Sequence, residues 1–290
     1  MFKTIAENLA QKNNKVWVIT NRVIGEEYQE LENLKILRVN PIIQYKGGLP
    51  PTFLDNIRYV INAVFKAKNI LKTEKIDIIH SNNFSPALAG SIVSSLTKKP
   101  HITTIHDIFS IYDKDFWKKW ASQSNVSYAN ARLVPLFEKM MIRFKISCIH
   151  TVSESTKRDI QRLGAKKSIC VIPNCIQEEQ PLQVVSKPKQ FAYLGRLVFY
   201  KNIEVILKAF VHVTKEFPDS RLVIAGDGPY RESLQNVTQK LGLENNVEFR
   251  GYVTLDQKKN LLAESNALLF PSLIEGFGLV MLESFQQKRP

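Results

Sequence analysis

The chain has 290 residues and a formal net charge of +13, with 44% hydrophobic and 23% charged residues. A chain of this length typically forms two domains, and its composition excludes wholesale disorder, collagen-like repeats and disulfide-stapled miniproteins. No stretch reaches the roughly 18 apolar residues of a membrane-spanning helix. The first residues also lack the apolar run and the cleavage site of a signal peptide. We therefore expect a cytoplasmic protein.

Most of the positive charge lies in the first half of the chain. Residues up to Lys145 include 21 Lys and Arg against 12 Asp and Glu. A basic surface attracts nucleic acids, anionic lipids and phosphorylated small molecules alike. Because the sequence has neither zinc-finger spacing nor an aromatic RNA-binding motif, we expect no nucleic-acid partner.

Short apolar or β-branched runs alternate with helical patterns along the chain. The predicted strands are Val16–Thr20, Lys35–Val39, Ile76–His80, His101–Ile105, Cys148–Val152, Ser168–Ile172, Phe191–Leu194, Arg221–Ala225, Val247–Arg250 and Ala267–Phe270. The predicted helices are Thr52–Lys72, Ser85–Leu96, Tyr128–Phe144, Ser153–Leu163, Ile203–Phe217, Tyr230–Leu241 and Leu255–Glu264. Several strands are apolar throughout, as is typical of parallel strands buried on both faces. The alternation predicts an α/β fold with right-handed crossovers.

A polar segment without periodicity, which contains Pro181 and Pro188, predicts a linker between two doubly wound domains. We place the first, acceptor-side domain at 1–178, the linker at 179–188 and the second domain at 189–290. Ligands of open parallel sheets bind at the carboxyl ends of the strands. Two Rossmann-like domains are therefore expected to face a shared cleft.

The strongest functional pattern is the segment 271–283, which follows the last predicted strand and opens a helix. Gly276 and Gly278 allow the backbone to approach a ligand closely, and the helix N-terminus at Leu279 presents N–H groups to an anion. Glu283 lies within that helix, where it can accept hydrogen bonds from hydroxyl groups. Taken alone, the segment also fits a plain strand–turn–helix with surface carboxylates.

Glycine-bearing turns follow three earlier strands of the second domain. Gly195 and Arg196 end one strand, and Lys201 follows at a helix start. The arginine fork and the lysine point charge suit a diphosphate, although two solvated cations are the common alternative. The other two turns contain Gly226 and Gly228, and Arg250, Gly251 and Tyr252. Four such turns at successive strand ends are much stronger evidence than a single glycine pair.

Together these residues resemble the nucleotide-sugar-binding half of the family 4 retaining glycosyltransferases, which have the GT-B fold, and the resemblance covers nearly the whole chain. Glu275 and Glu283, with seven residues between them, match the Glu-x7-Glu element of the family. The resemblance assigns Glu283 to the ribose hydroxyls and Glu275 to the donor sugar. It assigns the donor diphosphate to Arg196, Lys201, Gly278 and Leu279. It places Gly195, Gly226, Gly228, Arg250, Tyr252 and Phe277 beside the donor sugar, the diphosphate and the base.

The first domain contributes a strand-ending pair, His106 and Asp107, which resembles a His-Asp pair of the family. The family histidine lies near the reacting centre, so the resemblance gives His106 a catalytic role beside Glu275. A histidine at a strand end is otherwise often a satisfied core residue, and His80 is expected to be one. Cys175 stands where the family usually has glycine, so a positive φ at this position would strain the backbone.

The sequence indicates no metal site. Asp113 and Asp115 form a DxD pattern, which metal-dependent glycosyltransferases of another fold use to hold Mn²⁺ or Mg²⁺, but such short patterns are common by chance. Two Rossmann-like halves suit a metal-free scheme, in which Arg196, Lys201 and a helix dipole stabilise the departing diphosphate. The three cysteines form no CxxC pair, which predicts reduced thiols. We expect no metal and no cofactor apart from the donor substrate, a UDP- or GDP-linked sugar.

Residues 115–145 are basic and aromatic, with Trp117 and Trp120 among several lysines and arginines. Such a segment can lie on an anionic membrane, with its aromatic rings at the interface. A helix pair with an ordinary solvated face explains the pattern equally well. On the first interpretation the protein binds the inner face of the membrane peripherally.

The resemblance implies that a hexose moves, with retention, from a nucleoside-diphosphate sugar to a sugar or lipid-linked acceptor, in cell-envelope polysaccharide or glycolipid synthesis. The family begins with a strand and a glycine-rich loop and continues beyond the helix that ends this chain. We therefore expect both domains to be incomplete and the chain to be nearly inactive. The alternative is a sugar-nucleotide-binding fragment without turnover. A basic nucleic-acid-binding protein would explain none of the glycine turns.

Overall fold

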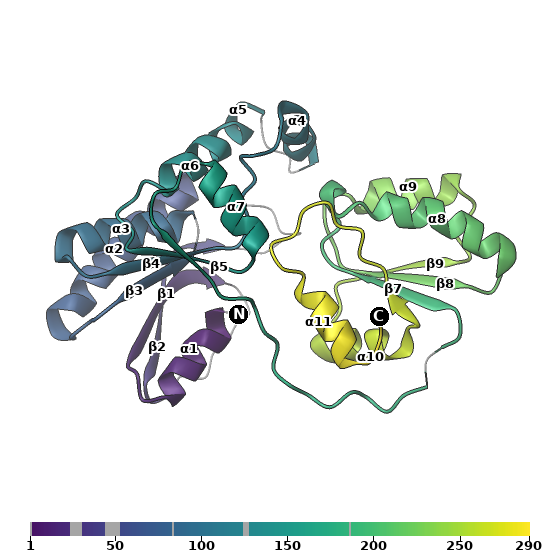
Figure 1. Ribbon diagram of the computed structural model, residues 1–290, viewed down its shortest axis with the longest axis horizontal. Coiled ribbons are helices and arrows are strands. Elements are labelled where there is room, and N and C mark those ends of the chain that lie inside the picture. Colours follow the sequence, from purple (N-terminus) through teal and green to yellow (C-terminus); the bar gives the residue numbers. More distant parts are fainter. Residues whose placement is uncertain (1, 24–30, 44–52, 83, 124–127, 186) are drawn as a thin grey trace. The chain divides into compact units, whose positions relative to one another are not determined.

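The computed structural model describes residues 2–23, 31–43, 53–82, 84–123, 128–185 and 187–290. The chain forms two compact units (Figure 1). The first unit comprises Met1–Trp117 and Tyr128–Pro173, and the second comprises Lys118–Ser127 and Asn174–Pro290. Each is an α/β domain built on parallel strands, so the predicted fold class of two Rossmann-like domains is confirmed.

The first unit contains two parallel sheets. β1 (Val16–Val23) pairs with β2 (Leu34–Ile43). The second sheet has the order β3-β4-β5-β6 and consists of β3 (Ile79–Asn82), β4 (His101–Ile105), β5 (Cys148–Thr151) and β6 (Ser168–Val171). The helices are α1 (Phe2–Gln11), α2 (Phe53–Thr73), α3 (Ser85–Thr97), α5 (Tyr128–Ala131), α6 (Leu133–Met141) and α7 (Glu154–Arg162), while α4 (Lys114–Gln123) passes from the first unit into the second.

The core of the larger sheet forms where α6 and α7 cover β4 and β5. Ile105, Met141, Ile149 and Ile160 are all fully buried in one cluster. Burying an aliphatic side chain of this size contributes about 1.5–3 kcal/mol. The Ser153 hydroxyl caps α7 by accepting the N–H of the third helical residue at 3.1 Å. This core fixes the carboxyl ends of β4 and β5.

The helix predicted over 128–144 is wrong as a single element, because it is divided into α5 and α6 at Arg132. Pro135 lies in the first turn of α6. A proline lacks the N–H that would donate to the carbonyl four residues earlier, at Ala131, and its ring crowds that carbonyl. The chain therefore ends one helix at Ala131 and starts another.

The second unit has one parallel sheet in the order β10-β7-β8-β9. Its strands are β7 (Gln190–Leu194), β8 (Arg221–Ala225), β9 (Val247–Gly251) and β10 (Ala267–Leu268). Its helices are η1 (Phe199–Lys201), α8 (Ile203–Glu216), α9 (Arg231–Lys240), α10 (Leu255–Glu264) and α11 (Leu279–Gln286). Because all four strands are parallel, the turns that follow them all lie on the side of the sheet where the strands have their carboxyl ends.

Candidate functional site

The turns after β7, β8 and β9 form one hydrogen-bonded layer in the second unit. The N–H of Gly195 donates to the carbonyl oxygen of Ala225 at 3.1 Å. The N–H of Gly226 donates to the carbonyl oxygen of Gly251 at 2.7 Å. The turns that the sequence singled out are therefore neighbours in space as well as in strand order.

Two of the glycines are required by this stacking of turns. Gly226 has φ +131°, and a Cβ there would lie 1.9 Å from the carbonyl oxygen of Gly195. A Cβ on Gly228 would lie 2.4 Å from the carbonyl oxygen of Leu197. Both distances are far below van der Waals contact with rigid backbone atoms. The need for glycine at these positions thus arises within the protein itself.

Lys201, at the end of η1, is bound to the loop that precedes α11. Its Nζ forms an ion pair with the Glu275 carboxylate and donates to the carbonyl oxygen of Ile274 at 3.2 Å. The Lys201 side chain is 15% exposed and that of Glu275 is 29% exposed. The lysine predicted for the diphosphate and the glutamate predicted for the donor sugar are therefore direct partners, and a third of their surface or less is in contact with solvent.

Tyr193, in β7, supports the turn that carries Arg196. Its hydroxyl donates to the carbonyl oxygen of Arg196 at 3.1 Å, while the Arg196 side chain is exposed. Burial, and then the negative charge of Glu275, raise the pKa of Tyr193. The phenol therefore stays protonated and acts as a donor. Tyr193 was not among the predicted site residues, although a tyrosine among the apolar residues of a buried strand is a signal that its hydroxyl has a specific partner.

The N-terminus of α11 is built around Gly278. This residue has φ +79°, and a Cβ on it would lie 2.6 Å from Cε of Met281. No side chain caps the helix, whose first N–H groups have no intrahelical partner by geometry. The N-terminal residue Leu279 and the preceding half-buried Phe277 lie at this positive end of the helix dipole. The arrangement suits an anion.

Glu283, in α11, is bound to Lys258 of α10 through an ion pair. About a quarter of each side chain is exposed. Lys258 was not among the predicted site residues, because nothing in the local pattern of α10 distinguishes it from the neighbouring Lys259. The carboxylate predicted for ribose hydroxyls is thus held in place by a cation on a neighbouring helix.

Two predicted residues have other surroundings. Arg250 donates from Nε to Oε1 of Glu248 at 2.7 Å, so this charge is neutralised within its own strand. Tyr252 is 86% exposed. The hydrogen bonds and ion pairs that connect Lys201, Glu275 and the glycine turns, as described above, do not include the side chains of Arg250 and Tyr252.

In the first unit His106 follows β4 and is half-buried. Its carbonyl oxygen accepts the Thr156 hydroxyl at 3.1 Å. Burial, and then the charge of His150, lower the pKa of His106, so its imidazole is neutral at neutral pH. A neutral imidazole can accept or donate a proton, as the predicted role near a reacting centre requires.

A buried carboxylate holds the chain that follows His106. Glu138, in α6, is fully buried and accepts the N–H of Phe109 at 3.1 Å and that of Ser110 at 2.7 Å. Burial raises the pKa of Glu138, while these two N–H groups lower it. With the Thr156 contact, the segment from His106 to Ser110 is fixed at both ends. Glu138 was not among the predicted site residues.

His80 belongs to a row of polar side chains across the sheet of the first unit. Its Nε2 lies 2.7 Å from the Thr104 hydroxyl, which in turn lies 2.9 Å from Nδ1 of His150. Burial is the main cause that lowers the pKa of His80. The row connects β3, β4 and β5.

Three further expectations concern other residues. The Asp113 carboxylate accepts the N–H of Phe116 at 2.9 Å and so caps α4. Cys175 does not have a positive φ, so the strain considered for it is absent in this described residue. Trp117 is buried, and the expectation that it contributes to an interfacial aromatic belt is wrong. Within the described ranges, no three or more His, Cys, Asp or Glu side chains form a group that could hold a metal ion.

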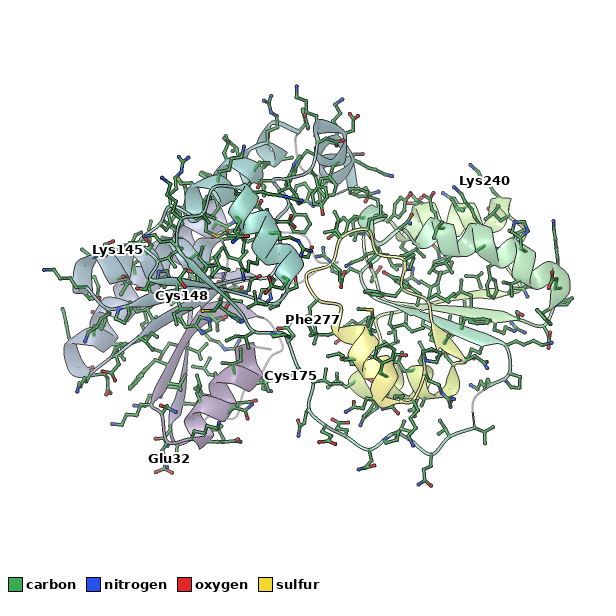
Figure 2. The ribbon with its side chains drawn as sticks, in the orientation of Figure 1. Glu32, Lys145, Cys148, Cys175, Lys240 and Phe277 are labelled. Atoms are coloured by element: carbon green, nitrogen blue, oxygen red, sulfur yellow. The ribbon has the colours of Figure 1, made fainter. Side chains whose placement is uncertain are left out.

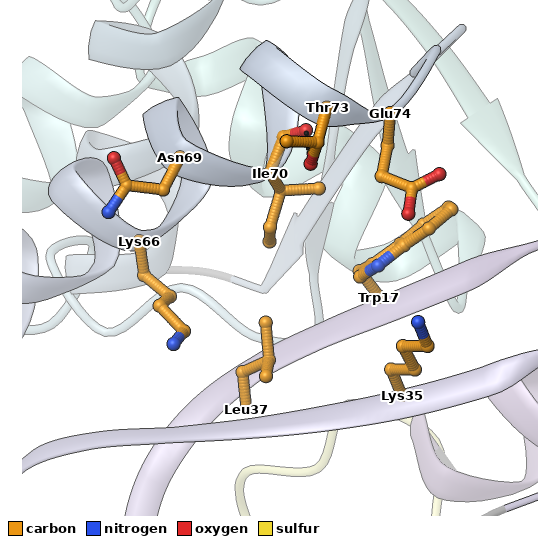
Figure 3. Close-up of a pocket in the computed structure, with 8 residues that line it drawn as sticks. All are labelled: Trp17, Lys35, Leu37, Lys66, Asn69, Ile70, Thr73 and Glu74. Atoms are coloured by element: carbon orange, nitrogen blue, oxygen red, sulfur yellow. Dashed lines mark hydrogen bonds between the residues drawn. The ribbon is translucent and has the colours of Figure 1, made fainter.

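A cavity of about 240 Å³ lies elsewhere, between α2 and the sheet of β1 and β2 (Figure 3). Figure 3 shows Lys66 and Asn69 of α2 opposite Leu37, and Lys35 beside Trp17. None of the predicted site residues lines this cavity. We therefore describe two candidate regions separately: the turns of the second unit, and the loop that carries His106 in the first unit.

Comparison with known families covers the whole chain. The family described as Glycosyltransferase Family 4 matches residues 1–180, and the one described as Glycosyl transferases group 1 matches residues 176–290. Alpha-monoglucosyldiacylglycerol synthase of Streptococcus pneumoniae is 26% identical over 310 residues, which are 99% of this chain and 65% of that protein. The chain thus spans less than two thirds of the length of this relative.

Solved structures give the same fold. Sucrose-phosphate synthase from Thermosynechococcus elongatus has a TM-score of 0.77 at 17% identity, over 100% of this chain and 73% of that one. The Anabaena protein HepE, solved in complex with UDP and glucose, has a TM-score of 0.64 at 17% identity, over 94% and 79%. With the strand order and the glycine turns described above, these matches establish that the chain belongs to glycosyltransferase family 4 and has the GT-B fold of two Rossmann-like domains.

Proposed function

We propose that this glycosyltransferase moves a hexose, with retention, from a UDP- or GDP-linked sugar to a sugar or lipid-linked acceptor. The observation that carries the proposal is the grouping of Lys201, Glu275 and the N-terminus of α11 beside the stacked glycine turns. Positive charge, a helix dipole and close backbone approach are what a nucleoside diphosphate requires.

In the proposed reaction the bond between the anomeric carbon and the diphosphate oxygen breaks, and a bond to the acceptor oxygen forms on the same face. The departing phosphate takes the proton of the acceptor hydroxyl. Arg196 and Lys201 stabilise its charge, Glu283 binds the ribose hydroxyls and Glu275 binds the donor sugar. His106 acts near the reacting centre. The retention and these roles rest on the family resemblance.

We propose that no metal ion takes part. Two cations and the positive end of α11 can neutralise a diphosphate electrostatically, and Asp113, the first residue of the DxD pattern, caps α4 through its carboxylate. EDTA should then leave donor affinity and turnover unchanged. Activity that returns only with Mn²⁺ or Mg²⁺ would instead assign Asp113 and Asp115 to a metal site.

The acceptor is proposed to be a membrane glycolipid or an envelope polysaccharide. The synthase from S. pneumoniae that resembles this chain is named for a glucosylated diacylglycerol. The outer face of α6 carries the exposed side chains of Leu133, Leu136, Lys139 and Met140, and the exposed Arg132 and Arg143 flank the helix on either side. In the described ranges no helix is both long and apolar enough to cross a bilayer. We propose that this face contacts anionic lipid at the inner surface of the membrane.

The test is calorimetry with UDP and GDP, followed by a panel of donor sugars read by nucleotide release. Arg196→Ala should lose about 1.5–3 kcal/mol of nucleotide affinity, because a charge-assisted contact to phosphate disappears. Arg221→Ala is the matched control, since this exposed arginine is the first residue of β8 and lies at the end of the strand away from the glycine turns. Unchanged affinity in Arg196→Ala would refute the diphosphate role. Binding without turnover of any donor would favour a binding fragment.

A further inference from the structure

Two cysteine thiols are in contact on neighbouring strands of the first unit. Cys148 is the first residue of β5, and its Sγ lies 3.4 Å from Sγ of Cys170 in β6. Strand register explains the contact. Cys170 is opposite His150, two residues beyond Cys148, so these three side chains share one face of the sheet. Figure 2 marks Cys148 on this sheet.

The two thiols differ in exposure. Cys170 is exposed and Cys148 is half-buried. Burial, and then the S–H contact that Cys148 makes with Cys170, raise the pKa of Cys148. An oxidant that arrives from solvent therefore meets Cys170 first, while Cys148 lies behind it as a thiol already in contact with the sulfur that reacts.

The pair is better described as a dithiol than as a metal site. His150 is the nearest further ligand on this face, but both of its ring nitrogens have partners. Nδ1 lies 2.9 Å from the Thr104 hydroxyl, and Nε2 lies 3.1 Å from the carbonyl oxygen of Ile172. In the described part of the chain these groups form no cluster of three ligands. Two sulfur atoms alone leave a zinc ion without its usual four ligands.

We propose that Cys148 and Cys170 are a redox modification site, which a hydroperoxide converts into a disulfide between β5 and β6. The sulfur of Cys170 takes one peroxide oxygen to become a sulfenic acid, and the first water, or an alcohol, leaves. The sulfur of Cys148 then attacks Cys170 and displaces that oxygen as water. The peroxide gains two electrons, one from each sulfur, and both thiol protons end in the leaving molecules. The S–S distance must shorten to about 2 Å. Because Cys170 is opposite His150, the two cysteines are diagonal neighbours. A shift of β6, the last strand in the order of its sheet, must therefore accompany side-chain rotation.

The bond would close a loop that contains β5, α7 and β6. Such a loop restricts the unfolded chain and so stabilises the folded state. We therefore expect the oxidised protein to melt several degrees above the reduced protein, reversibly with dithiothreitol. The proposal does not depend on the transferase reaction, so it can be tested without substrate.

The experiment treats the reduced full chain with a small excess of hydrogen peroxide, then counts free thiols and maps the linked peptides by mass spectrometry. We expect two of the three thiols to disappear and a link between Cys148 and Cys170 in a monomeric product. Cys175→Ser is the matched control and should lose two thiols equally well. Cys170→Ser should protect Cys148. Cys148→Ser should leave a sulfenic acid on Cys170 that dimedone traps.

A link between Cys170 and Cys175, a disulfide between two chains, or uniform oxidation of all three cysteines would overturn the proposal. A probe that needs no substitution guards against variants that fail to fold. Phenylarsine oxide bridges two neighbouring thiols, so the folded wild-type chain should bind one equivalent of the reagent and lose two free thiols. A dithiol added afterwards should remove the reagent, whereas a monothiol should not. A folded chain that binds no arsenical would equally contradict the pair.

Discussion

The ammonium group of Lys201 is ion-paired with the carboxylate of Glu275 and also donates to the carbonyl oxygen of Ile274 at 3.2 Å. The lysine ends η1, and its two partners precede α11. The pair therefore connects the turn after β7 to the N-terminus of a helix that lies much later in the chain. A diphosphate bound at this place would compete with Glu275 for the charge of Lys201.

This competition gives opposite expectations for the two partners. Glu275→Gln should raise the affinity for UDP by about two- to fivefold, because a partly exposed ion pair of about 0.5–1 kcal/mol no longer opposes binding. The same change should lower turnover by about 10² if the carboxylate serves the donor sugar. Lys201→Met should weaken UDP binding by about 1.5–3 kcal/mol. Calorimetry measures the UDP affinity of both variants. A change in the same direction and of the same size in both would contradict the competition.

Substitutions of Glu283 and Lys258 can distinguish binding of the ribose from binding of the diphosphate. Glu283→Gln should weaken binding of UDP by about tenfold and leave binding of pyrophosphate unchanged, because only the nucleotide has ribose hydroxyls. Lys258→Met removes the partner but leaves the carboxylate, so UDP affinity should not fall as far. Competition calorimetry with both ligands decides. Loss of both ligands to the same extent would exclude the ribose assignment.

The stacking of turns makes Gly226 a strict requirement of the fold. Gly226→Ala should cost about 3 kcal/mol or more, since the added Cβ meets the carbonyl oxygen of Gly195 at 1.9 Å and the backbone has φ +131°. Gly242→Ala is the control, because Gly242 has φ +66° with no atom within 4 Å of the added Cβ. That variant should cost only about 1–2 kcal/mol of backbone strain. Urea unfolding measures the free energy of unfolding of both variants. Equal losses would show that the turn at Gly195 moves to accommodate the added Cβ.

Local patterns were sufficient to predict the fold class. Apolar runs identified every strand of both larger sheets, and the glycine turns after β7, β8 and β9 were identified from their positions at strand ends. The division between α5 and α6 could also have been predicted, because Pro135 interrupts the helical pattern of residues 128–144. The pairing of Arg250 with Glu248 follows from alternation, because residues two apart on a strand share one face.

Contacts between distant segments could not be predicted in this way. Glu138 of α6 accepts the backbone N–H groups of Phe109 and Ser110, which lie in the loop after β4. Lys258 of α10 pairs with Glu283 of α11. Neither residue has a distinctive neighbour in the sequence. On one of the two interpretations of residues 115–145, the basic neighbours of Trp117 indicated a ring at a membrane surface, yet the ring is buried. A charged flank does not determine which way an aromatic side chain points.

The outer face of α6 is expected to bind anionic vesicles. Leu136→Ser combined with Met140→Ser should reduce binding to phosphatidylglycerol vesicles by about 10²-fold or more, because burial of each side chain contributes about 1.5–3 kcal/mol. Phosphatidylcholine vesicles should bind weakly in either case. Ile61→Ser with Phe65→Ser is the matched control, since these residues of α2 are also apolar and exposed. Loss of binding in the α2 variant alone would move the contact to that helix.

Glu138 offers a test of stability against pH. Its pKa in the folded state is raised above the ordinary value of 4.5 by burial, so folding favours the protonated carboxyl. The stability gained from protonation is fully present below the unfolded pKa and is lost as pH rises through the folded pKa. Relative to Glu138→Gln, which does not titrate, the wild-type chain should therefore lose stability as pH rises from below about 4.5 toward neutrality. Urea unfolding at several pH values measures this difference, and a constant difference would show that the pKa is not shifted.

The same substitution tests how His106 is held. In the wild-type chain Phe109 and Ser110 both donate to Oε2 of Glu138, and Phe109 also donates to Oε1 at 3.2 Å. A glutamine at 138 keeps only one carbonyl oxygen, and its NH₂ group opposes the N–H of Phe109. We expect kcat to fall by about tenfold to 10², because the loop after His106 shifts, while UDP affinity in the second unit stays unchanged. Glu154→Gln is the control, since this glutamate is exposed in the first turn of α7. A loss of UDP affinity equal to the loss of kcat would mean that Glu138 supports the fold as a whole and does not specifically position His106.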